Sequence, residues 1–177
     1  RRESRAVSHV LELGGTCGYD FEYTSTVTNR GEESIFWPMW LRKRVGDPWL
    51  GSVTRVSLSG TDADLRGLTA FPQLSILKLR ETRITGTGFR HLQELTKLEQ
   101  VGLSQSPITP QGLSELRGIG CVHSLDLWGI EPTHELVQEL LHFRRLSFLE
   151  WQIGWEAACP FASRLESRFS DLVIYSP

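Results

Sequence analysis

The most constraining feature of this sequence is a periodic pattern of apolar residues between positions 53 and 151. Four of them stand 24 residues apart: Leu74, Leu98, Val122 and Leu146. Other columns keep the same spacing: Leu77, Val101, Leu125 and Leu149; Leu79, Leu103, Leu127 and Trp151; Leu92, Leu116 and Leu140. A shortened copy begins at Val53, 21 residues before Leu74. A period of this length indicates a repeat protein in which every copy forms the same unit.

Each copy is expected to form a strand, a turn, a short helix and a return loop. In one copy, Leu77 and Leu79 lie on one side of a strand and Lys78 on the other. A threonine stands at the expected helix N-cap of three copies: Thr85, Thr109 and Thr133. Pro110 then occupies the first helical position, where its missing N–H costs no hydrogen bond. The apolar residues of each helix recur every three positions, which predicts one buried stripe.

A single copy cannot fold alone, because its few apolar side chains do not offset the entropy lost on ordering 24 residues. The copies must stack, so that their strands pair into a parallel sheet and their apolar faces merge into one core. The predicted fold class is therefore α/β. We expect a short solenoid with the parallel sheet on its concave side and the helices on its convex side.

The repeat motif also carries a resemblance to a known family. The pattern L-x-x-L-x-L-x-x-T-x-I-T-x-x-G-[LF]-x-x-L runs from Leu74 to Leu92 and, with two variant positions, from Leu98 to Leu116. It resembles the repeats of bacterial leucine-rich repeat proteins, which implies a ribonuclease-inhibitor-like solenoid. The motif is specific for this fold and nearly silent about function.

The resemblance also implies a hydrogen-bond ladder between adjacent repeats. In many relatives an asparagine at one loop position ties neighbouring turns together, and here that position holds Thr61, Thr82 and Ser106. Their hydroxyls can make a similar but shorter hydrogen bond. Ile130 stands at the same position in the next repeat and cannot do so, which predicts that the ladder lapses there.

We expect a single domain in three parts: an N-terminal cap over 1–52, repeats over 53–153 and a C-terminal cap over 154–177. The first cap should contain a helix from Ser4 to Leu13, a strand from Tyr19 to Tyr23, a polar loop and a helix from Pro38 to Val45. The second should contain a helix from Pro160 and a strand from Leu172 to Tyr175. Both caps would cover apolar ends of the stack.

The composition narrows the classes of partner. A net charge of −2 argues against the basic face of a nucleic-acid-binding protein. No apolar run approaches the roughly 20 residues of a membrane span, so direct membrane insertion by this segment is not expected. The chain begins with Arg1 rather than Met, and its first arginines suit either a solvated end or a site beside a removed membrane span. We expect a cytoplasmic chain, free or as the soluble part of a membrane-anchored protein.

The sequence offers no catalytic constellation, so we predict a non-enzymatic protein without metal or cofactor. His134 and Glu135 begin like a zinc-protease H-E-x-x-H motif, but Gln138 replaces the second histidine. Three cysteines stand in an expected cap loop, a return loop and the terminal region, without paired spacing: Cys17, Cys121 and Cys159. Reduced thiols are the simplest interpretation.

The strand positions that alternate with the core residues predict an exposed binding face. Lys78 and Arg80 form a basic group on it, whereas Asp126 and Glu150 form an acidic one. Two aromatic residues, Trp128 and Phe148, complete the candidate site. Exposed aromatic residues beside charges are typical of protein-binding hot spots. The alternative is that both aromatic side chains fold down over each other or under the C-terminal segment.

These observations favour a non-catalytic protein–protein interaction module that uses the concave face of the repeats. A protein of unknown identity is the expected partner. The second hypothesis is a regulatory or anchoring domain of a larger bacterial protein, membrane-tethered or not, whose caps dock on a sister domain.

Overall fold

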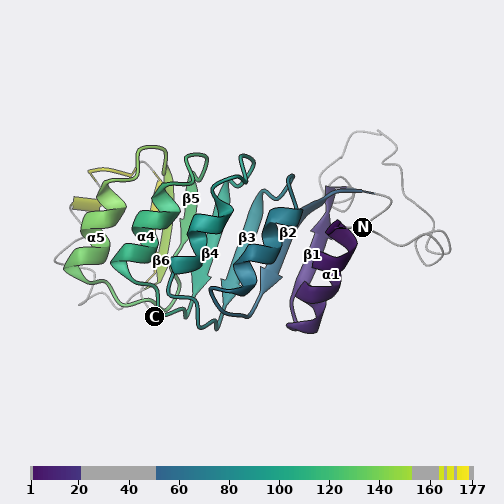
Figure 1. The fold of residues 1–177 in the computed structure, drawn as a ribbon. Helices are drawn as coiled ribbons and strands as arrows, with labels where there is room; N and C mark the ends of the chain where they lie inside the picture. Colours follow the sequence, from purple (N-terminus) through teal and green to yellow (C-terminus); the bar gives the residue numbers. More distant parts are fainter. Residues whose placement is uncertain (1, 21–50, 153–163, 166, 170, 176–177) are drawn as a thin grey trace.

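The computed structural model describes residues 2–20, 51–152, 164–165, 167–169 and 171–175. Within these residues the chain is an α/β protein with one seven-stranded sheet, whose strands follow one another in chain order (Figure 1). The strands are β1 (Thr16–Tyr19), β2 (Val53–Leu58), β3 (Ile76–Arg80), β4 (Gln100–Ser104), β5 (Ser124–Asp126), β6 (Phe148–Gln152) and β7 (Asp171–Tyr175). β1 is antiparallel to β2, and every later pair is parallel. The predicted α/β class is confirmed.

The helices all lie on one side of this sheet (Figure 1). They are α1 (Arg2–Glu12), the 3-10 helices η2 (Asp64–Ala70) and η3 (Thr87–Leu92), α4 (Pro110–Arg117) and α5 (His134–Leu141). From η2 to α5, each helix connects one parallel strand to the next and packs beside the helix before it. The strand–helix unit therefore recurs four times, from β2 to β6, as the repeated sequence predicts.

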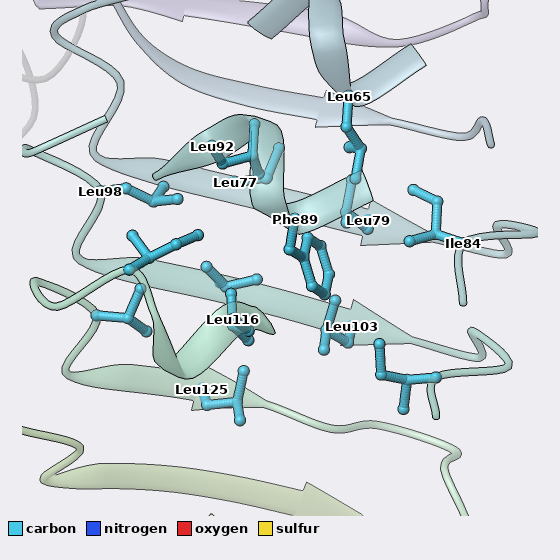
Figure 2. Close-up of a cluster of buried hydrophobic side chains, with 14 of the residues drawn as sticks. Leu65, Leu77, Leu79, Ile84, Phe89, Leu92, Leu98, Leu103, Leu116 and Leu125 are labelled. Carbon is cyan, nitrogen blue, oxygen red and sulfur yellow. The ribbon is translucent and has the colours of Figure 1, made fainter. Parts of the chain in front are cut away.

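Residues that are 24 positions apart in the sequence pair with one another on adjacent strands of the sheet from β3 to β6. Leu77 pairs with Val101, Val101 with Leu125, and Leu125 with Leu149. These side chains are completely buried and face the helices, which contribute Phe89, Leu92, Leu113, Leu116, Val137 and Leu140 to the same core. Figure 2 shows Phe89 between the strand residues Leu79 and Leu103. One apolar layer is thus continuous from repeat to repeat.

Two of the three predicted helix N-caps are confirmed. The Thr109 hydroxyl accepts a hydrogen bond from the Gly112 N–H, and the Thr133 hydroxyl accepts one from the Leu136 N–H. Pro110 follows Thr109 at the start of α4, as expected. The prediction for Thr85 is wrong. Gly86, with φ of 100°, is the N-cap residue of η3, and the Thr85 hydroxyl binds another repeat.

That hydroxyl binds Asp62, which accepts four hydrogen bonds from the following repeat. Thr85 donates its N–H (2.9 Å) and its O–H (2.8 Å) to Oδ2 of Asp62, while the Gly86 N–H (3.0 Å) and the Gly88 N–H (2.9 Å) donate to Oδ1. Burial alone would raise the pKa of this carboxyl, but the hydrogen bonds together hold the pKa below its ordinary value. Asp62 therefore joins the first two repeats as an anion.

The predicted hydroxyl ladder is confirmed for one junction. The buried hydroxyl oxygens of Thr82 and Ser106 lie 2.7 Å apart, within hydrogen-bond distance. Thr61 was expected in the same ladder, which is wrong: its exposed hydroxyl donates to Asp64 in its own repeat (2.8 Å). At Ile130 the ladder does lapse, and the Ile130 carbonyl instead accepts a hydrogen bond from the Trp151 indole N–H (2.7 Å).

The N-terminal elements differ in position from those expected. The first helix is confirmed, and it begins two residues before Ser4. β1 covers Thr16–Tyr19 and overlaps the strand predicted from Tyr19 to Tyr23 only at Tyr19, while residues 21–23 lie outside the described residues. The left-handed Gly14 (φ 72°) reverses the chain directly after α1, which brings the next residues beside β2. The helix predicted from Pro38 to Val45 lies outside the described residues.

At the other end, the predicted strand is confirmed as β7, one residue longer than expected. Leu165 and Phe169 are buried, in agreement with the apolar face expected there. The start of the helix predicted at Pro160 is outside the described residues. Among the helices that are described, none has both the length and the apolar character needed to cross a membrane.

We expect the Asp62→Asn variant to unfold more easily than the native chain at neutral pH. The amide would turn an NH2 group toward donors, at a cost of about 1.5–3 kcal/mol in free energy of unfolding. Because the pKa of Asp62 is lower in the folded state, its contribution is complete above the unfolded pKa and is lost as pH falls through the folded value. Urea unfolding at neutral and at acid pH should therefore show a difference that shrinks on acidification. Glu94→Gln, at an exposed helix end, is the control; equal losses in both variants would contradict the role of Asp62.

The hydroxyl pair can be tested with a double-mutant cycle. Thr82→Val or Ser106→Ala alone should each lower the free energy of unfolding by about 1–3 kcal/mol, because the remaining buried hydroxyl loses its partner in the adjacent repeat. The double variant should cost less than the sum of the two, since no unpaired hydroxyl remains. Additive losses in urea unfolding would show that the two hydroxyls do not interact.

Candidate functional site

One face of the sheet is packed under helices, and the other carries the predicted site residues. Along each strand the side chains alternate between the two faces. We define the open face by the positions opposite the core: Arg55, Ser57, Ile76, Lys78, Arg80, Gln100, Gly102, Ser104, Ser124, Asp126, Phe148 and Glu150. Most of these residues are half-buried or exposed, whereas Gly102 and Ser124 are buried. The open face is therefore a largely polar surface on a hydrogen-bonded sheet.

The basic and acidic groups predicted on this face meet across a glycine. Lys78, Gly102 and Asp126 are register partners on β3, β4 and β5. A Cβ at Gly102 would lie 3.5 Å from Oδ2 of Asp126 and 3.8 Å from Cγ of Lys78, so both side chains flank the space above the glycine. Because Gly102 has no side chain, the two opposite charges influence each other across an intervening strand. They form one polar site.

Asp126 has the most perturbed carboxylate of this face. Burial raises the pKa of Asp126 above its ordinary value. The hydrogen bond from the Trp128 N–H and the positive charges of Lys78 and Arg80 act in the opposite direction without cancelling the effect of burial. The carboxylate is thus partly withdrawn from water and set in a field of mixed sign.

Trp128 lies in a turn, which differs from its predicted place on a strand of the exposed face. β5 ends at Asp126, whose Oδ1 accepts the Trp128 N–H (3.1 Å). The Trp128 carbonyl accepts the Gln105 N–H from the preceding repeat (2.8 Å), and Gly129 then reverses the chain with φ of 70°. The Trp128 side chain is 50% exposed. A tightly bonded turn therefore presents a large apolar side chain to solvent.

Phe148 and Glu150 stand on β6, beside β5. Phe148 pairs with the buried Ser124, and Glu150 pairs with Asp126. Both β6 side chains are half-buried. The structure thus brings Asp126, Glu150 and Phe148 onto neighbouring strands, while Lys78 and Arg80 lie two strands away on β3. Arg80 is exposed at the end of its strand.

The cysteines and the histidine considered as reactive or metal-binding residues lie in different parts of the fold. Cys17, expected in a loop, lies in β1, where burial and then the negative charge of Glu3 raise the pKa of its thiol from 9.0 to about 11. Cys121 lies in a return loop and donates to the Leu95 carbonyl (3.3 Å). His134 is exposed at the start of α5. Among the described residues, no three histidine, cysteine or acidic side chains are grouped as metal ligands would be.

The sequence did not predict a further surface feature of the structure. It is a hollow of about 790 Å³ between the return loops of the last two strand–helix units, and we call it the arginine cleft. Its lining includes Arg117, Gly120, Cys121, His142, Arg144 and Arg145. The sequence contained a signal, because Gly120 and Arg144 are 24 residues apart in one column. Because Gly120 has no side chain, an open space remains beside the charged side chain of Arg144.

Comparison of the sequence with known proteins returned no family model and no curated protein that matches it.

The reactivity of Cys17 follows from its raised pKa. At pH 8 the thiolate fraction should be about 100-fold lower than that of a thiol with the ordinary value, because two pKa units separate them. Alkylation by iodoacetamide, followed by mass spectrometry of the Cys17 peptide, should be correspondingly slow in the folded chain and fast in guanidinium. Equal rates in the two states would contradict the burial of this thiol.

Proposed function

We propose that this chain is a leucine-rich repeat module that binds another protein through the open face of its sheet and carries out no catalysis. On this proposal the repeats form a short solenoid and the open face is its concave side. The in-register parallel strands, the helices on a single side and the recurring 24-residue unit support this interpretation. So does the rigidity of the scaffold, since a surface that is already ordered loses little entropy on binding.

The observation that carries the proposal is the exposure of Trp128. Only two large apolar side chains of the described residues are strongly exposed, and Trp128 is the one beside the open face. Exposure of a tryptophan in a turn held by two hydrogen bonds has no evident benefit for folding. Tryptophan is enriched among the residues that dominate binding energies. Trp128 is therefore the proposed anchor.

The charges around this anchor define the partner's chemistry. Lys78 and Arg80 would face a carboxylate of the partner, whereas Asp126 and Glu150 would face a basic side chain. Trp128 would receive an apolar or aromatic group. A partner surface with both signs of charge, spaced by about two strand separations or ~10 Å, fits this arrangement.

The proposal predicts that an open-face variant loses its partner. Lys78→Glu, Arg80→Glu and Trp128→Ala should together abolish retention of a protein that the native chain captures from a lysate. Removal of the anchor alone should weaken binding by about 2 kcal/mol or more, roughly 30-fold. Isothermal titration with the captured protein measures this loss.

A matched control carries the same kinds of change on the helix side. It combines Arg66→Glu and Arg90→Glu with Leu11→Ala, which truncates the other strongly exposed apolar residue. This control should retain the partner. Capture that is unaffected by the open-face variant, or lost equally in the control, would overturn the proposal and favour docking through another surface.

A further inference from the structure

We infer that the arginine cleft is a second binding site, separate from the open face, and that it takes an acidic, extended segment of a protein. The cleft lies where the chain leaves α4 and α5 and returns toward the sheet. Arg80, on the open face, and Trp128, in the turn beside it, lie at or just beyond the opposite ends of the strands. The proposed anchor Trp128 and the arginine cleft are therefore at opposite ends of the strands.

The 24-residue register explains why a hollow exists here. Each return loop places two outward residues between two buried apolar ones. In one loop Phe143 and Leu146 are buried on either side of Arg144 and Arg145. In the loop before it, Gly120 and Cys121 take the places of these two arginines. A Cβ at Gly120 would meet nothing within 4 Å, so the space beside the arginines is open.

Hydrogen bonds hold the backbone of the loop that carries the two arginines. The Phe143 N–H donates to the Leu140 carbonyl (3.1 Å), and the Phe143 carbonyl accepts a hydrogen bond from the Arg168 guanidinium. With Phe143 and Leu146 buried, the loop can only direct Arg144 and Arg145 outward. This arrangement fixes the backbone from which the two arginine side chains extend.

The charge of the cleft is not neutralised by its own lining. Among the described residues, the lining contains three arginines and one histidine and no acidic side chain. Arg117 is paired with Glu139 at 3.2 Å, outside the lining. Arg144 and Arg145 make no ion pair or side-chain hydrogen bond with the residues that the structure describes. Two cations with an open space between repeats are complementary to carboxylates.

These two arginines have no evident role in the helices. α5 ends at Leu141, and favourable interactions with a helix dipole are confined to the last turn. Arg144 and Arg145 lie three and four residues beyond that end. The nearby helix C-termini, which carry partial negative charge, disfavour a compact anion placed deep in the cleft. An extended segment can contact both arginines from the outer side, which is why we assign an acidic peptide rather than phosphate.

The test measures binding of a fluorescein-labelled peptide of alternating glutamate and glycine by fluorescence polarisation. The Arg144→Glu, Arg145→Glu variant should weaken binding by about tenfold or more, since each attraction becomes a repulsion. Arg66→Glu with Arg90→Glu changes the net charge equally, at another hollow of about 380 Å³, and should leave binding nearly unchanged. Loss in both variants would show general charge attraction and overturn the site.

A third variant tests whether the open space of the cleft is needed in addition to its charge. Gly120→Trp fills the hollow and leaves every arginine in place, and its new side chain starts in open space. It should weaken binding at unchanged net charge, while circular dichroism confirms that all variants remain folded. Undiminished binding would show that the hollow is not used. Displacement of the peptide by inorganic phosphate at constant ionic strength would identify a simple anion site and also overturn the assignment.

Discussion

The described structure depends on the in-register pairing of parallel strands whose residues are 24 positions apart. Each strand from β1 to β6 brings only one to three apolar side chains to the core, and each helix a few more. The pairing of Leu77, Val101, Leu125 and Leu149 aligns these small sets into one dry layer. A shift of one residue would turn these leucines to the open face and place Lys78 and Asp126 in the core. The alternation of side chains therefore sets both the fold and the surface.

Three side-chain contacts between repeats differ from one junction to another, although the apolar columns are alike. Asp62 joins the first two repeats through an ionised carboxylate, and Thr82 meets Ser106 through a hydroxyl pair. Further along, the Trp151 indole binds the Ile130 carbonyl. Each solution satisfies buried polar groups where the chain enters a helix or a turn, which a stack must do wherever water is excluded. The apolar register allows this variety, because it does not depend on the loop chemistry.

The contrast between uniform apolar columns and varied polar contacts explains which features could be predicted from the sequence. The apolar columns and the N-caps at Thr109 and Thr133 follow local rules and were predicted correctly. Thr85 was assigned the same role by register, but Gly86 supplies a left-handed turn and Asp62 recruits the Thr85 hydroxyl. A contact between residues 23 positions apart is not visible in a local pattern. β1 was missed for a similar reason, since it depends on the turn at Gly14 and on pairing with β2, which lies far along the chain.

The candidate site shows the same limit. The open-face positions of β3, β4 and β6 could be read from alternation, yet the meeting of Lys78 and Asp126 depends on the missing side chain of Gly102. Trp128 does not lie on a strand as predicted, because its N–H donates to the Asp126 carboxylate and β5 ends at Asp126. Gly102 on the open face and Gly120 in the arginine cleft each lack the side chain that their column neighbours carry. If the chain binds a partner as proposed, such departures would give the surface its specificity, because identical repeats would offer a partner no unique position.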